Sequence, residues 1–222
     1  ITSGHASLEE CFWLNRLRQA KPGPVYLVPC VGEDDGFLIS ADRSPNVRGA
    51  WVSGLVDHLD CFHLEALEAA IARGEIDTLF ILGKEAFALP KNVLSRVSVV
   101  YLGTHWPDLP PEGALGLPGQ AVYEKKGSFV NRQFRLQAFY PAVPAPQGVP
   151  SDWESLQFLL RQLLPGGPQA ESWEDAWDQM AASCPSLQGL QFGKWPEEGV
   201  LLEVDPAWKR LAFVDAPALA PA

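Results

Sequence analysis

The chain has 222 residues, 47% of them hydrophobic, and a mean hydropathy of −0.02, a composition typical of a folded globular protein. A chain of this length can bury roughly 70% of the surface that its unfolded form exposes. The formal net charge of −10 argues against nonspecific binding to nucleic acid or to anionic membranes, because both favour a basic surface. No apolar run approaches the ~20 residues that span a bilayer, and no signal-peptide pattern opens the chain. The chain begins at Ile1 rather than Met, so we expect a fragment of a larger protein.

The cysteines argue against a metal centre. All four are far apart in the sequence, with no Cys-x-x-Cys pair: Cys11, Cys30, Cys61 and Cys184. Iron–sulfur clusters and structural zinc sites need closely spaced thiolates that converge on one metal. Spacing alone leaves disulfides open, but reduced, mostly buried thiols in a cytoplasmic protein are favoured.

The first half of the chain alternates helices with short apolar runs. Ser7 and Glu10 form a capping box that begins a helix, and residues 64–71 have helical spacing, with Gly74 in the position of a C-terminal cap. Four runs predict strands, the second more weakly than the others: residues 25–28, 37–39, 78–82 and 97–102. This alternation predicts an α/β fold with a doubly wound, mostly parallel sheet and helices on both of its faces.

The next segment carries a strand with one buried face. From Asn131 to Gln137 polar and apolar residues alternate, which is the period of such a strand. Gly127 lies between a polar turn and this strand, where either a positive φ or the close approach of another segment requires glycine. Strands around Val122 and Phe134 are expected to extend the parallel sheet or to fold over its edge.

A proline-rich spacer at residues 141–146 separates two regions, an α/β domain over residues 1–150 and an extension over residues 151–222. The extension is predicted to hold helices that begin at Ser151 and Ser172, and to pack on the same domain. Its two short strands, residues 199–204 and 210–214, predict a β-hairpin.

Five tryptophans lie in the last third of the chain: Trp153, Trp173, Trp177, Trp195 and Trp208. They are either an exposed surface that has lost its partner or ordinary core residues.

Chemically informative residues are few. The densest group of potential metal ligands is at residues 57–63, but His58 and His63 are five residues apart and do not share a helical face. We favour a polar loop in which Asp60 or His63 lies at the N-terminus of a helix. Gly83 follows the strand at residues 78–82, at the sheet edge where doubly wound folds bind ligands, although glycine also ends strands for conformational reasons.

Two further segments have alternative interpretations. Glu124 is a candidate catalytic acid, but beside Lys125 and Lys126 we favour an ionised turn residue. Residues 105–107 can line a pocket or form a surface corner, and we favour the corner. No Ser/His/Asp triad is identifiable, because such triads are recognised by geometry rather than by sequence.

Several segments together resemble the molybdopterin oxidoreductase superfamily. The stretch Glu124–Gln137 has the order acid, turn, Gly127, small hydroxyl, aromatic and Asn131, followed by a strand. Two other segments are also similar to segments of the superfamily. One is the helix and turn at residues 70–76 before the strand at residues 78–82, and the other is the Leu-Pro pair at residues 117–118. One family within the superfamily is that of an iron–sulfur subunit of bacterial NADH-quinone oxidoreductase (respiratory complex I). Residues 2–10 and 42–50 resemble this family. The resemblance covers residues 1–164.

The chain also departs from the cofactor-binding members of that superfamily. Their strand equivalent to residues 78–82 continues into an Asn-Pro pair, whereas here it continues Lys84-Glu85-Ala86. Arg132 replaces the usual acid after the signature asparagine, and neither the ligand to molybdenum nor the iron–sulfur motifs occur in this sequence. We therefore expect no catalytic or metal-binding residue and no cofactor in this fragment. Four positions are vestigial candidates for cofactor binding: Gly83, Glu124, Gly127 and Asn131.

The resemblance implies a non-catalytic structural domain, C-terminal in that iron–sulfur subunit. Its partners would be upstream iron–sulfur domains of its own chain, which hold the clusters, and other peripheral-arm subunits of complex I. It would be cytoplasmic, or at the cytoplasmic face of the inner membrane, with no nucleic-acid partner and no membrane insertion.

The main alternative is a truncated cofactor-binding module of an active molybdenum or tungsten oxidoreductase such as a formate dehydrogenase. In that case Gly83, Glu124 and Asn131 would contact the pterin. An unrelated nucleotide-binding α/β protein is disfavoured, because the sequence has no phosphate-cradling glycine motif.

Overall fold

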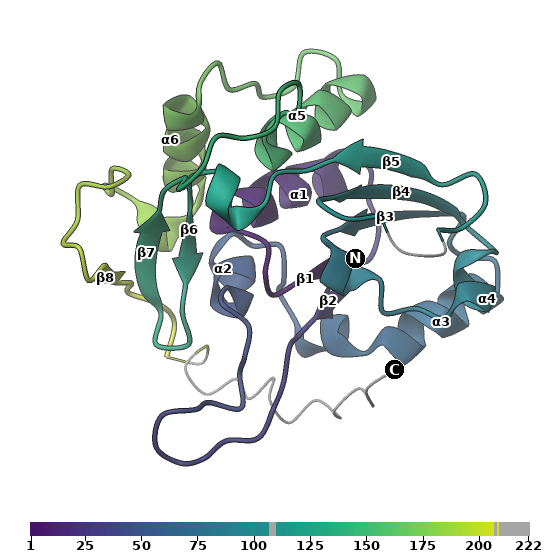
Figure 1. Ribbon diagram of the computed structural model, residues 1–222, viewed down its shortest axis with the longest axis horizontal. Helices are drawn as coiled ribbons and strands as arrows, with labels where there is room; N and C mark the ends of the chain where they lie inside the picture. The colour runs from purple at the N-terminus through teal and green to yellow at the C-terminus, as the bar shows by residue number, and fades with distance from the viewer. Residues whose placement is uncertain (107–109, 207, 209–222) are drawn as a thin grey trace.

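The computed structural model describes residues 1–106, 110–206 and 208, and its largest element is a five-stranded parallel sheet (Figure 1). The strand order is β2-β1-β3-β4-β5, and β3 pairs with β4 from Thr78–Ser98 to Leu82–Leu102. The strands are β1 (Thr2–Ser3), β2 (Leu27–Val28), β3 (Thr78–Leu82), β4 (Ser98–Gly103) and β5 (Leu115–Pro118). Because the chain winds outward from β1 in one direction and from β3 in the other, the topological switch point lies between β1 and β3.

Helices cover both faces of this sheet. The helices α1 (Leu8–Ala20) and α3 (Leu64–Ala72) lie on opposite sides, with the short α4 (Lys91–Leu94) on the side of α3 (Figure 1). Alternate residues of β3 belong to different hydrophobic clusters: Leu79 and Ile81 pack with α3 and α4, whereas Leu82 packs with α1. This arrangement confirms the predicted α/β fold with a doubly wound parallel sheet.

A second sheet of three antiparallel strands lies beside the first. It consists of β6 (Gly127–Val130), β7 (Arg135–Phe139) and β8 (Val200–Leu201), with β7 in the centre. The β6–β7 hairpin packs near α1 and the short helix α2 (Val47–Val52) (Figure 1). The expected strands in this region therefore form a sheet of their own instead of extending the parallel one.

The predicted single strand from Asn131 to Gln137 is wrong, because the chain reverses direction inside it. The Asn131 Oδ1 atom accepts hydrogen bonds from the backbone amides of Gln133 (2.9 Å) and Arg135 (3.0 Å). Phe134 takes a left-handed conformation with φ of 59°. An asparagine that bonds its own following backbone is a turn former, and it competes here with the strand-like alternation.

Other corrections concern short elements. Residues 37–39 form an exposed loop rather than a strand, and Val122 lies in the 3-10 helix η3 (Val122–Glu124). The elements β1, β5, α2 and α4 are too short for a periodicity signal. The second strand of the expected C-terminal hairpin, residues 210–214, lies outside the described residues.

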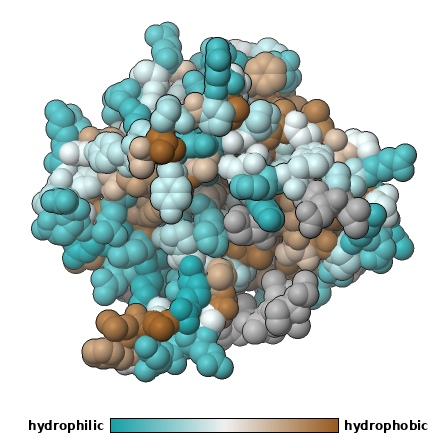
Figure 2. All heavy atoms as spheres, in the orientation of Figure 1, coloured by the Kyte–Doolittle hydropathy of each residue, from teal (hydrophilic) through white to brown (hydrophobic). Residues whose placement is uncertain are grey.

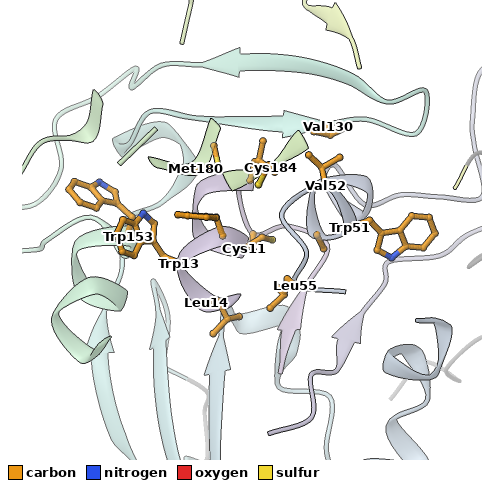
Figure 3. Packing of buried hydrophobic residues seen from close by; sticks show 14 of the residues in the cluster. Cys11, Trp13, Leu14, Trp51, Val52, Leu55, Val130, Trp153, Met180 and Cys184 are labelled. Carbon is orange, nitrogen blue, oxygen red and sulfur yellow. The ribbon is translucent and has the colours of Figure 1, made fainter. Parts of the chain in front are cut away.

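The C-terminal helices pack onto α1. Both α5 (Asp152–Leu163) and α6 (Trp173–Ser183) contribute to the cluster around α1, where Trp153 lies against Trp13 and Met180 is buried (Figure 3). Trp173 and Trp177 are buried in the same cluster, and Trp195 and Trp208 are half-buried against it. The tryptophans of the last third are therefore core residues.

The remaining 3-10 helices are η1 (Leu59–Phe62), η2 (Lys84–Ala86) and η4 (Pro185–Leu187). None of the helices in the described part of the chain combines the length and the apolar character that crossing a membrane requires.

The conformation of Gly83 leads to the first testable prediction. Its φ of 86° and ψ of 148° lie in a region open to little but glycine, and its amide donates to the Leu102 carbonyl (2.9 Å) before the chain enters η2. We expect Gly83→Ala to lower the free energy of unfolding by about 1–3 kcal/mol, measured by urea denaturation. Gly23→Ala is the control, because Gly23 has ordinary φ and open space around it. Equal urea midpoints for the two variants would contradict this account.

Candidate functional site

The candidate site is a cavity of about 320 Å³ at the carboxyl edge of the parallel sheet. It opens at the switch point, where doubly wound folds hold their ligands. Its polar lining comes from the segments after β1, β3 and β4 and from two later segments, and includes Ser3, Ser7, Gly83, Thr104, Lys125 and Asp152.

The N-terminus of α1 lies at this cavity. The carboxylate of Glu10 binds to this helix N-terminus. A helix that begins directly after the first strand offers free amides and a positive dipole end, where many folds bind an anion. Here Glu10, in the first turn, accepts a hydrogen bond from the Ser7 amide (3.0 Å), while the Ser7 hydroxyl accepts one from the Glu10 amide (3.2 Å). The predicted capping box is thus confirmed, and it supplies a negative charge at the position of a ligand.

A buried ionic triad is built on that carboxylate. The Lys125 ammonium donates to Glu10 Oε1 (2.5 Å) and also to the Asp152 carboxylate at the start of α5. All three side chains are largely withdrawn from solvent. The triad therefore joins α1, the segment after η3 and α5, which are distant in the sequence.

Glu10 and Asp152 share the ammonium of Lys125, and their pKa values shift in opposite directions. Burial alone would raise the pKa of Glu10, but the charge and hydrogen bond of Lys125 outweigh burial and hold it below its ordinary value. Burial, together with the negative charge of Glu10, raises the pKa of Asp152 to about 7. Burial would lower the pKa of Lys125, but its attraction to Glu10 and Asp152 raises it. The two carboxylates therefore titrate as a coupled pair, with Asp152 the more readily protonated of the two.

Glu9 is a third buried carboxylate, next to Glu10 in the first turn of α1. Its Oε2 accepts a hydrogen bond from the Ser128 amide (3.0 Å) and its Oε1 accepts one from the Ser128 hydroxyl (2.8 Å), which fixes β6 to α1. Burial raises the pKa of Glu9 to about 7.

The same contact explains Gly127. A Cβ at this position would come within 2.7 Å of the Phe139 ring and 3.0 Å of Glu9 Oε2. Gly127 is therefore required by the close approach of other side chains and not by a positive φ.

Asn46 provides a third buried link. Its Nδ2 donates to the Ala6 carbonyl (2.7 Å) after β1, and its Oδ1 accepts from the Val130 amide (2.7 Å) in β6. The segment between β1 and α1 is thus tied to the second sheet.

The structure brings only one of the four vestigial candidates to the cavity. Gly83 lines it, whereas Gly127 lies in β6 and Asn131 shapes the hairpin turn. Glu124 accepts a hydrogen bond from the Ala121 amide (2.8 Å) at the start of η3 and is a capping residue.

Sequence reasoning missed the triad. The local pattern places Lys125 in a polar turn and indicates only a helix cap for Glu10. No local pattern pairs three charges that lie 27 and 115 residues apart.

The histidine and cysteine residues do not converge. His58 Nε2 is 3.4 Å from Asp57 Oδ1 at the surface, and His63 precedes α3, with Nδ1 3.0 Å from Glu65 Oε1. Of the two residues expected at a helix N-terminus, His63 is the N-cap residue of α3, whereas Asp60 lies within η1. Over residues 1–106, 110–206 and 208, no group of three or more His, Cys, Asp or Glu side chains could hold a metal ion.

The remaining sequence candidates lie outside the site. Cys11, Cys61 and Cys184 are buried, and Cys30 is exposed. Trp106 is exposed and packs on the Tyr101 ring, as expected for a surface corner; Pro107 lies outside the described residues.

The residues at the cavity do not fit a molybdopterin cofactor. The volume is near the small end of ligand pockets, which run to roughly 300–1,000 Å³. The phosphate-bearing part of such a cofactor would meet the Glu10 and Asp152 carboxylates at the helix N-terminus, where an anion is normally attracted.

A scan against models of known protein families finds none that matches this chain.

We expect Lys125→Met to lower the free energy of unfolding by about 3–5 kcal/mol, because it leaves two buried carboxylates without their counter-ion. The triple variant Glu10→Gln/Lys125→Met/Asp152→Asn should recover most of that loss, since it removes every charge. Lys126→Met is the control: Lys126 pairs with the exposed Glu174 and should cost about 1 kcal/mol or less. Equal losses for Lys125→Met and Lys126→Met in chemical denaturation would contradict the role of the triad.

The raised pKa of Glu9 predicts a pH-dependent stability. With a folded pKa of about 7 against an ordinary value of 4.5, the native state binds more protons than the unfolded state between these pH values. This contribution therefore favours the native state most below about pH 4.5 and weakens until about pH 7. Glu9→Gln removes the titration, so the stability of the variant relative to the parent should rise from pH 5 to pH 8. A constant difference across this range of urea titrations would show that Glu9 does not titrate as proposed.

Proposed function

We propose that this chain is a non-catalytic structural domain of the iron–sulfur subunit of an NADH-quinone oxidoreductase. Its role is to brace the iron–sulfur domains that carry electrons from NADH toward quinone. The observation that carries the proposal is the buried triad, which places the protein's own charges at the ligand-binding edge of a doubly wound sheet.

Polar groups that are already satisfied support a structural role. A binding or catalytic site keeps polar groups directed at a ligand, and a ligand must contribute contacts that the empty protein lacks. Here the Ser7 amide, Glu10, Lys125 and Asp152 already bond to one another. Glu9 and Asn46 add further links, from α1 to β6 and from the segment after β1 to β6. Such a network favours rigidity over exchange of a ligand.

The sequence resemblance supplies the biological setting of the proposal. The partners are upstream iron–sulfur domains and other subunits of the peripheral arm. The location is the cytoplasm or the cytoplasmic face of the inner membrane. No nucleic acid is involved.

The second candidate is a cofactor-binding module of a molybdenum or tungsten oxidoreductase. The observation in its favour is the cavity itself, which lies at the switch point and has Gly83 and Lys84 in its wall. For a cofactor to enter, the carboxylates of the triad would have to move away from the helix N-terminus.

Cofactor content separates the two candidates. We expect the full-length protein purified from its own cells to contain far less than one molybdenum or tungsten atom per chain by elemental mass spectrometry. Fluorescence after acid oxidation should likewise detect no stoichiometric pterin. One metal atom and its pterin per chain would overturn the structural role and support the second candidate.

Assembly provides the positive test. On native gels the chain should migrate with the band that oxidises NADH, because the proposal places it in that complex. Lys125→Met should reduce the amount in this band, and the charge-free triple variant should restore it, since the bracing surface depends on the fold rather than on the charges. A chain that never migrates with the NADH-oxidising band would contradict the proposal.

A further inference from the structure

A projecting loop between β2 and α2 has an ordered neck. The loop extends away from the body of the molecule, at the lower left of Figure 1. The Gly32 amide donates to the Ala41 carbonyl (2.9 Å), and the Arg43 amide donates to the Cys30 carbonyl (2.9 Å). An antiparallel bridge between Val31 and Asp42 lies between these bonds. The two arms of the loop are therefore held together as a short hairpin-like stem.

The carboxylate of Asp35 holds the backbone at the tip of the loop. Asp35 Oδ1 accepts hydrogen bonds from the amides of Phe37, Leu38 and Ile39 at 2.9, 2.9 and 2.8 Å. The Asp35 amide donates in turn to the Ile39 carbonyl (3.1 Å). This local bonding defines the backbone of the tip although no hydrophobic core lies beneath it.

The side chains of this tip are strongly apolar and face solvent. Phe37 is 87% exposed, Leu38 80% and Ile39 44%. Figure 2 shows hydrophobic atoms at the end of this projection, at the lower left of the view. Two neighbouring large apolar residues held on an ordered protrusion have the character of an interface anchor, because their burial by a partner requires little loss of backbone freedom.

Three acidic residues lie on the arm of the loop that leads to the tip. Glu33, Asp34 and Asp35 directly precede it, and all three are exposed. The amides of Ile39 and Phe37 hold the pKa of Asp35 below its ordinary value, so this carboxylate is ionised at neutral pH. Arg43 donates to the backbone carbonyl of Glu33 (2.7 Å) rather than to its carboxylate. The apolar tip therefore has a negatively charged collar.

We propose that the Phe37–Leu38–Ile39 tip docks into an apolar pocket of another protein whose rim carries Lys or Arg side chains. The acidic collar decides between the two kinds of apolar partner, because three adjacent carboxylates are repelled by an anionic bilayer and attracted by a basic protein rim. The inference does not rest on the proposed structural role, since the loop lies away from the cavity and the triad.

Site-specific photocrosslinking identifies the partner. Phe37 is replaced by the photoreactive residue p-benzoylphenylalanine in the full-length protein, and intact cells that make it are irradiated. Mass spectrometry of the adduct should place it on one protein, in an apolar segment flanked by Lys or Arg. The same substitution at Phe158, which is 58% exposed on α5, is the matched control and should not give this adduct.

Variants then test the chemistry with the purified partner. Phe37→Ser/Leu38→Ser should weaken binding about thirtyfold, the loss typical of a hot-spot anchor, while the thermal midpoint stays unchanged because both side chains are exposed. Phe158→Ser should leave binding unchanged. Glu33→Lys should weaken binding several-fold and reduce its salt dependence, whereas Glu197→Lys makes the same charge change at an exposed site elsewhere and should have no effect.

Three results would overturn the inference. The first is the absence of an adduct from position 37, or adducts no different from those at position 158. The second is unchanged binding by the Phe37→Ser/Leu38→Ser variant. The third is co-sedimentation of the protein with vesicles of phosphatidylcholine and phosphatidylglycerol that Phe37→Ser/Leu38→Ser abolishes, which would assign the tip to a lipid surface instead.

Discussion

The contact on which the rest of this structure depends is the buried ammonium of Lys125 between Glu10 and Asp152. Taking three charges out of water is costly, and the cost is offset only when each charge finds a close partner. That requirement determines where α1, η3 and α5 meet, because each charge comes from one of these elements or from the residue directly after it. The triad thus fixes the start of α5 to the start of α1, at the edge where the strands of the parallel sheet end.

Other buried polar contacts extend the same constraint. Glu9 binds Ser128 of β6, and Asn46 joins the segment after β1 to Val130, so the second sheet is attached to the start of α1. Every one of these bonds uses a polar group near the carboxyl edge of the parallel sheet. In doubly wound folds this edge is where ligands bind, and here its polar groups bond to other segments of the same chain.

The surface, in contrast, carries apolar side chains that no other described part of the protein covers. The acidic loop with Phe37 and Leu38 at its end leaves large apolar groups exposed on a stiff support. The polar groups of the triad have partners inside the protein, whereas the apolar side chains of the tip are exposed. This distribution of satisfied and unsatisfied groups connects the proposed bracing role to the proposed docking tip, although each rests on its own residues.

The α/β class, the strands β3 and β4 and the starts of α1, α5 and α6 could be predicted from the sequence, because apolar periodicity and capping residues such as Ser7 are local signals. The same holds for Gly83 at the ligand-binding edge, since a glycine after a buried strand is a local signal. The turn at Asn131 was not predictable in this way, because a side chain bonding its own backbone outweighed the alternation of polar and apolar residues. The partners of Lys125 were decided by the tertiary structure alone, because charges distant in the sequence become neighbours only when the sheet and helices have packed.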